Sequence, residues 1–171
     1  MTKRILAVLL AVAAISVFAY SARATTNGLS DAAGDVAEPK ADILSSAAAY
    51  TDGQITLTTS VASPTNPSTD PNWNNNQSGV GWGLDTNGDG TVDFAAIYGK
   101  LGAGVFLPDQ TLKCQASGSY SPNSQPHYTV TFPASCINSP ASIRFAAGMR
   151  YFNGTQVNDF APDNQQVCCS V

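Results

Sequence analysis

The feature that most constrains the fold is a set of short segments in which apolar and polar residues alternate. In Gln54–Val61 (QITLTTSV) the odd-numbered positions are mostly apolar and the even-numbered positions are polar. The preceding segment, Asp42–Tyr50, is joined to it through Asp52 and Gly53. A period of two indicates a strand with one buried face, and an Asp-Gly pair suits the positive φ of a tight turn. These residues predict a β-hairpin.

Similar segments recur along the chain, and helical periodicity is almost absent after residue 24. Seven or eight short strands separated by Gly, Pro, Asn and Asp are typical of an antiparallel β-sandwich. We therefore expect an all-β fold, an antiparallel β-sandwich of about seven or eight strands in one domain, residues 42–171. Beyond the hairpin, the expected strands are Val80–Leu84, Thr91–Tyr98, Gln110–Ala116, His127–Phe132, Ile143–Phe152 and a short one after Asp159.

Two segments lack this pattern. Ser63–Gly79 contains three prolines and five asparagines, so we expect a long surface loop. Gly99–Gly104 (GKLGAG) lacks the ending of a phosphate-binding loop, and we interpret it as a flexible connection.

The first 24 residues have the pattern of a secretory signal peptide. Lys3 and Arg4 precede an apolar run, Ile5–Tyr20, and Ala22 and Ala24 form an A-x-A cleavage site. The alternative is an uncleaved membrane anchor, but the run is shorter than the roughly 20 residues of a spanning helix. We expect cleavage after Ala24, a secreted, extracellular protein and no membrane span in the mature chain.

The net charge of the mature chain limits the classes of partner that we expect it to bind. Removing residues 1–24 leaves 147 of 171 residues, and five of the eight cations against twelve acidic residues, a net charge of −7. An acidic protein of this kind is not expected to bind nucleic acid or an anionic membrane.

All four cysteines lie in the mature part of the chain. An even count in an oxidising compartment indicates disulfides, and four cysteines allow three pairings. We favour Cys114–Cys136, because both are near the ends of strands expected to be neighbours. Cys168 and Cys169 would then form a vicinal bridge or stay free near the end of the chain. Zinc is disfavoured, because no C-x-x-C pair occurs and His127 is the single histidine.

The segment Leu84–Phe94 (LDTNGDGTVDF) permits two interpretations. Asn87-Gly88 and Asp89-Gly90 are favoured turn pairs, so it could be a plain hairpin turn. A turn does not account for the acidic residues on either side, whereas a Ca²⁺ loop needs oxygen ligands at alternate positions and a glycine at the sixth. The expected ligands are Asp85, Asn87, Asp89, the carbonyl of Thr91, and Asp93.

This segment is not an EF-hand, because Ala96 occupies the twelfth position and the flanking segments are strands. It resembles the shorter D-x-[DN]-x-D-G-x-x-D calcium loops of integrin-type propeller repeats and thrombospondin type 3 repeats. With one carboxylate fewer than an EF-hand loop and an extracellular setting, the expected Ca²⁺ is structural and of modest affinity, about 10⁻⁴–10⁻³ M.

A second acidic segment, Ser30–Ile43, lies in the N-terminal arm, residues 25–41, and runs into the first expected strand. It resembles the entry segment of secreted bacterial β-sandwich domains of the DOMON-like, family 9 carbohydrate-binding type. A later motif of that family, W-x-[LIV]-D before a D-G-D turn, is matched by Trp82-Gly83-Leu84-Asp85. Ala32 departs from the proline usual in that family. The resemblance implies a second metal or structural site, and the alternative is a solvated arm. The residues concerned are Asp31, Asp35 and Asp42.

No catalytic constellation is visible. The chain has no G-x-S-x-G, S-x-x-K or H-E-x-x-H motif, and His127 falls on the polar face of its expected strand. Binding is a stronger hypothesis, because Trp73 in the asparagine-rich loop could stack on a sugar or fold back on its own loop. We therefore expect a non-catalytic binding or surface-interaction module, with polysaccharide as the leading ligand class. The alternatives are a purely structural exported or cell-envelope protein and, third, an enzyme.

Overall fold

The computed structural model describes residues 24–171, which form an all-β structure. The prediction of an all-β antiparallel fold is confirmed. The predicted signal peptide lies outside the described residues, apart from Ala24, and stays a prediction. Within residues 24–171 no helix has the length and apolar character needed to cross a membrane.

The strand count and the sandwich prediction need correction. The described residues form ten strands in one antiparallel sheet, in the order β1-β2-β3-β8-β7-β6-β5-β4-β9-β10. The strands are β1 (Thr25–Ser30), β2 (Ile43–Thr51), β3 (Gln54–Val61), β4 (Gly79–Asp85), β5 (Phe94–Gly99), β6 (Gly102–Phe106), β7 (Leu112–Ser121), β8 (His127–Pro133), β9 (Arg144–Phe152) and β10 (Gln156–Ala161).

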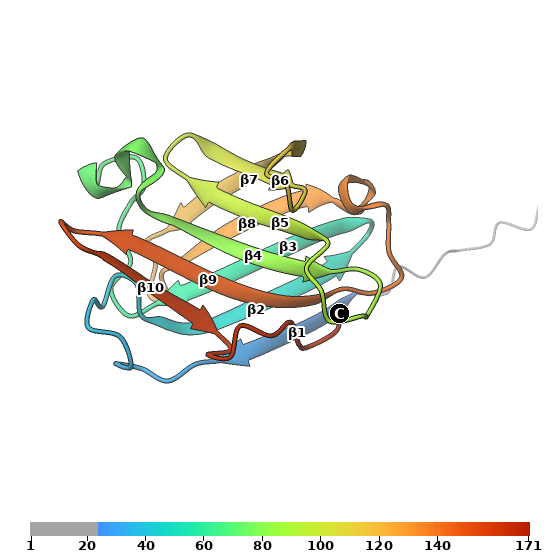
Figure 1. Cartoon of the computed structure of the whole chain (residues 1–171), viewed down its shortest axis with the longest axis horizontal. Coiled ribbons are helices and arrows are strands. Elements are labelled where there is room, and N and C mark those ends of the chain that lie inside the picture. Colours follow the sequence, from blue (N-terminus) through green and yellow to red (C-terminus); the bar gives the residue numbers. More distant parts are fainter. Residues whose placement is uncertain (1–23) are drawn as a thin grey trace, which may run out of the picture.

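This sheet curls until its two edges approach each other, so that it is nearly closed into a barrel. β1 and β10 are the edge strands, and Figure 1 shows both on the same side of the molecule. β2, next to β1, also contacts β9 and β10. We call the region where β1 and β10 approach each other without pairing the seam.

The extra strands arise in segments with weak local signals. β6 begins in the glycine-rich segment that we interpreted as a flexible connection, yet it pairs with both β5 and β7. β1 falls in the expected N-terminal arm and pairs with β2 from Thr25 to Ser30. Neighbouring strands supply hydrogen bonds and packing that outweigh low intrinsic strand propensity.

The interior of the curled sheet holds the hydrophobic core. The alternation in β3 and β4 is confirmed, because Ile55 and Leu57 are buried and so are Val80, Trp82 and Leu84. The core contains residues from both halves of the sheet.

Trp73 belongs to this core, which corrects its interpretation as a residue exposed for stacking on a ligand. It lies in a short 3₁₀ helix, η1 (Pro71–Asn76), and its side chain is fully buried. Its ring packs against Tyr128 at 5.3 Å between centroids, and its Nε1 donates to the Thr65 hydroxyl at 3.0 Å. Of the two outcomes that we considered, Trp73 folds back and anchors its own loop.

Two disulfides join cysteines within the described residues. Cys114 of β7 is bonded to Cys136 in a second 3₁₀ helix, η2 (Ala134–Ile137), which follows β8. β7 and β8 are neighbours in the sheet, as the favoured pairing assumed. Cys168 and Cys169 form a vicinal bridge, and the backbone of Cys168 pairs with Phe145 of β9.

Candidate metal site

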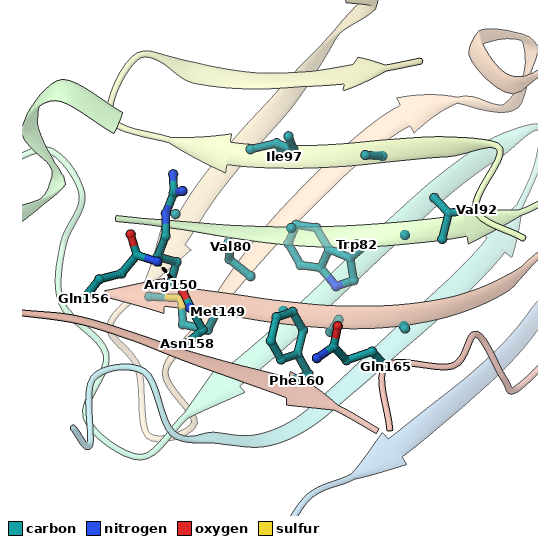
Figure 2. Close-up of a pocket in the computed structure, with 17 residues that line it drawn as sticks. Val80, Trp82, Val92, Ile97, Met149, Arg150, Gln156, Asn158, Phe160 and Gln165 are labelled. Atoms are coloured by element: carbon teal, nitrogen blue, oxygen red, sulfur yellow. Dashed lines mark hydrogen bonds between the residues drawn. The ribbon is translucent and has the colours of Figure 1, made fainter. Parts of the chain in front are cut away.

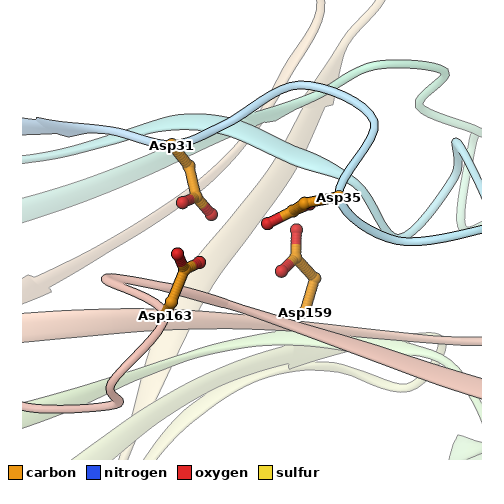
Figure 3. Close-up of side chains that lie close together, drawn as sticks. All are labelled: Asp31, Asp35, Asp159 and Asp163. Atoms are coloured by element: carbon orange, nitrogen blue, oxygen red, sulfur yellow. The ribbon is translucent and has the colours of Figure 1, made fainter.

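Four carboxylates from opposite edges of the sheet meet at the seam. Asp31 and Asp35 follow β1, Asp159 belongs to β10, and Asp163 follows β10. One carboxylate oxygen from each lies within 4.8 Å of the other three. Figure 3 shows the two pairs on separate segments with their carboxylates directed toward one another. We call these four residues the acidic cluster.

Backbone contacts hold the cluster in place. The Asp31 amide donates to the Leu44 carbonyl at 3.1 Å, which ties the end of β1 to β2. Asp159 is only 4% exposed, and its Oδ2 accepts from the Ile43 amide at 2.6 Å. Its Oδ1 accepts from the Phe160 amide at 2.8 Å. The bond from Ile43 connects β10 with the start of β2.

Asp42 lies outside the group of four but supports it. Its Oδ2 accepts from the Gly34 amide at 2.8 Å, which orders the turn that carries Asp35. Asp42 is 4% exposed, and its Oδ1 has no hydrogen-bond donor. The Oδ2 of Asp31 is also buried without a donor. A buried polar atom that lacks a partner is costly, and a bound cation is one way to satisfy it.

Burial and mutual repulsion disfavour the ionised form of the carboxylates in this cluster. Burial raises the pKa of Asp31 to about 6; the carboxylates of Asp159, Asp163 and Asp35 add to this rise, and a backbone hydrogen bond from Ala32 opposes it. Burial also raises the pKa of Asp159, against the hydrogen bonds from Ile43 and Phe160, with Asp35 and Asp42 contributing further. Like charges disfavour ionisation, whereas a cation favours it.

The structure thus brings together two of the three N-terminal aspartates that the sequence singled out, and adds two that it did not. Asp159 and Asp163 were missed because they lie about 125 residues away along the chain. Their only sequence signal is a pair of acidic residues four positions apart around the last strand. Such an acidic group can hold a metal ion, with oxygen ligands suited to a hard cation.

The predicted calcium loop has a different environment. Asp85, at the end of β4, is 1% exposed, and its Oδ2 accepts from Nη2 and Nε of Arg144 at 2.6 and 3.0 Å. The amides of Asn87, Gly88 and Gly90 donate to the same carboxylate at 2.7–3.1 Å. Burial alone would raise the pKa of Asp85, but these hydrogen bonds, with Arg144 the largest contributor, lower the pKa to about 2.

The other predicted ligands bond within the loop. Asp93 accepts from the amide and hydroxyl of Thr86 at 2.8 and 2.7 Å, and from the Asn87 side-chain amide at 3.4 Å. Asn87 accepts from the Asp89 amide, and Asp89 accepts from the Thr91 amide. Calcium in this loop stays a prediction, and these internal donors are the groups with which a metal would compete.

A separate groove of about 580 Å³ lies on the outer face of β5, β4, β9 and β10. One row across the sheet pairs Ile97 with Gly81, Gly81 with Gly148, and Gly148 with Phe160. The Phe160 ring lies over Gly148, where a Cβ would be 3.1 Å from it, so the open backbone floor between the larger side chains is at Gly81. Figure 2 shows Ile97 and Phe160 on opposite sides of it.

Polar side chains lie at the ends of this groove. Figure 2 shows Arg150, Gln156 and Asn158 together at one end, while Gln165 lies beyond Phe160. Gln156 donates to Asn158 at 3.1 Å. The groove combines an apolar floor with amide and guanidinium groups, a composition found in small-molecule and sugar sites.

A comparison with models of known protein families finds no match to this chain, and a search of curated proteins finds no similar sequence. The resemblance to DOMON-like and family 9 carbohydrate-binding domains therefore remains an expectation from short motifs.

Proposed function

We propose that this protein is an exported, non-catalytic β-module that binds Ca²⁺ at its acidic cluster. The observation that carries the proposal is the meeting of four carboxylates across the seam, with a buried oxygen of Asp31 that has no donor. Ca²⁺ fits because it takes six to eight oxygen ligands, with carboxylates in one- or two-oxygen contact. Neither histidine nor cysteine belongs to the cluster, which disfavours zinc.

The proposed role of the ion is structural. Two ligands follow β1 and two belong to or follow β10, so one ion would connect the two edges of the sheet. The edge strands of a sheet carry unpaired backbone N–H and C=O groups, which can pair with strands of other chains. An ion at the seam would hold both edges against each other.

Thermal unfolding tests the calcium proposal. With a dissociation constant of about 10⁻⁴ M, 10 mM calcium stabilises the folded state by about 2.7 kcal/mol. For a domain of about 150 residues this raises Tm by roughly 5–10 °C. The double variant Asp35→Asn/Asp163→Asn should lose the rise, because it removes two exposed carboxylates of the cluster that accept no described backbone hydrogen bond.

The matched control is Asp52→Asn, which removes a negative charge from the exposed turn between β2 and β3 and suits the positive φ there. It should keep the full calcium response. Equal Tm values for wild type in calcium and in chelator would end the proposal.

A second proposal concerns the ligand, for which polysaccharide remains the leading class. It is supported by the groove, where Gly81 leaves space for a sugar ring beside the Phe160 ring, and polar groups at the ends could bond hydroxyls. A Cβ at Gly81 would meet its nearest neighbour at 3.6 Å, so Gly81→Leu can fill the groove without a clash at Cβ.

Binding to insoluble polysaccharides and to a glycan array tests this second proposal. Wild type and Leu101→Ala, a change at an 88% exposed residue outside the groove, should bind alike, and Gly81→Leu should not. If wild type binds no glycan while calcium still raises Tm, the purely structural alternative is favoured.

A further inference from the structure

The loop Asp85–Asp93 has the ligand order of a calcium loop but is organised around a side chain of the protein. Arg144, the first residue of β9, is the register partner of Asp85, the last residue of β4. This pairing brings the guanidinium to the carboxylate at 2.6 Å. The contact is therefore a cross-strand pair between the ends of two neighbouring strands of the sheet.

Both carboxylates that bracket the loop are fully supplied with donors. Asp85 accepts hydrogen bonds from three backbone amides and from two nitrogens of Arg144. Asp93 accepts from both donors of Thr86 with one oxygen and from Asn87 with the other. No oxygen of either carboxylate lacks a protein donor.

The glycine at the sixth position has a second role here. Gly90 has φ +89°, and a Cβ at this position would lie 3.7 Å from Nη2 of Arg144. Its amide donates to the same Asp85 oxygen that the guanidinium contacts. A buried carboxylate needs a compensating charge, and Arg144 provides it from a side chain that is 32% exposed.

We propose that Arg144 is the resident cation of this loop, so that the loop folds without a divalent ion, and that removing the guanidinium exposes a site for Ca²⁺ or a lanthanide. Asp85 and Asp89 would be the main ligands of that exposed site. The proposal does not rest on calcium binding at the acidic cluster.

The test measures sensitised Tb³⁺ luminescence and calcium binding by calorimetry in the Asp35→Asn/Asp163→Asn background, so that the acidic cluster does not contribute. With Arg144 intact we expect no saturable binding up to 1 mM. Adding Arg144→Gln should produce saturable Tb³⁺ binding that calcium displaces. Adding Asp89→Asn to that variant should weaken this binding at least tenfold.

Two results would overturn the proposal. One is saturable binding with Arg144 intact that Asp89→Asn abolishes, because the wild-type loop would then be a metal site. The other is a folded Arg144→Gln variant that takes up no Tb³⁺.

A further comparison keeps the proposal testable if Arg144→Gln does not fold. Asp89→Asn in the otherwise wild-type chain should leave every calcium-induced change in Tm intact, and a reduced change would contradict the proposal. If wild type shows no calcium-induced change, calcium binding at the cluster fails, and the luminescence experiment alone decides on the loop.

Discussion

At the residue scale, one acidic position of LDTNGDGTVDF, Asp85, has its partner far along the chain, and the other acidic positions have theirs within the loop. The spacing of Asp85 and Asp93 predicts a cation, and the structure supplies a guanidinium for the first and internal donors for the second. Closely spaced carboxylates in a sequence indicate that the folded structure must supply positive charge or hydrogen-bond donors to them. They do not say whether an ion or Arg144, 59 residues later, meets that need.

The prediction at this scale is a pH-dependent loss of stability in Arg144→Gln. The pKa of Asp85 is about 2 in the folded protein, below its usual 3.8, so its ionised form contributes stability above pH 4 that is lost as the pH falls toward 2. Removing one partner of a buried pair costs about 3 kcal/mol. Urea unfolding should show this deficit at pH 7, shrinking toward pH 2.5.

Lys113→Gln is the matched control for charge, because Lys113 is exposed on β7. Its stability should equal that of wild type at both pH values. A deficit for Arg144→Gln that is the same at pH 7 and pH 2.5 would show that Arg144 acts through packing and not through the Asp85 charge.

At the element scale, β7 passes very close to an aromatic ring of the core, and a glycine makes this approach possible. A Cβ at Gly118 of β7 would lie 2.4 and 2.7 Å from atoms of the Tyr98 ring and 2.9 Å from the Ala103 side chain. Tyr98 is 8% exposed and its ring lies 6.3 Å from that of Trp73, so it has little room to move. A glycine in a strand often marks a close approach of this kind.

We therefore expect Gly118→Ala to destabilise the protein by about 1–3 kcal/mol through overpacking. Gly81→Ala on β4 is the matched control, because its Cβ would have only ordinary contacts, and it should change stability by less than about 0.5 kcal/mol. Denaturant unfolding of both variants measures the difference. Equal midpoints for the two variants would show that Tyr98 yields without cost.

At the scale of the whole molecule, the acidic cluster at the seam makes the stability of the fold depend on the pH and the cations of the solution. Asp31 has a pKa of about 6 in the folded protein, above its usual 3.8. Between pH 4 and 6 the folded state therefore holds a proton that the unfolded state releases, so without a cation stability falls as the pH rises through this window. A cation in the cluster reverses the effect by favouring the ionised carboxylates.

The prediction is that the calcium-induced rise in Tm is largest at pH 7 and much smaller at pH 5, where Asp31 is protonated. Calorimetric scans of metal-free protein with and without 10 mM calcium at pH 5, 6 and 7 measure it. Asp52→Asn should follow wild type at each pH. A rise of equal size at pH 5 and 7 would place the calcium effect somewhere other than this cluster.

The sequence by itself determined the strand class and much of the local structure. Alternation in Gln54–Val61 and the Asp-Gly turn before it are local signals, and so are the turns of the Asp85–Asp93 loop, because period and turn chemistry act between near neighbours. The tertiary structure alone decided that the strands form one nearly closed sheet. It also decided that Trp73 is buried, that Arg144 meets Asp85, and that Asp31 and Asp35 meet Asp159 and Asp163. These outcomes depend on strand order and register, which are set by packing between segments far apart in the sequence and leave no trace in the local pattern.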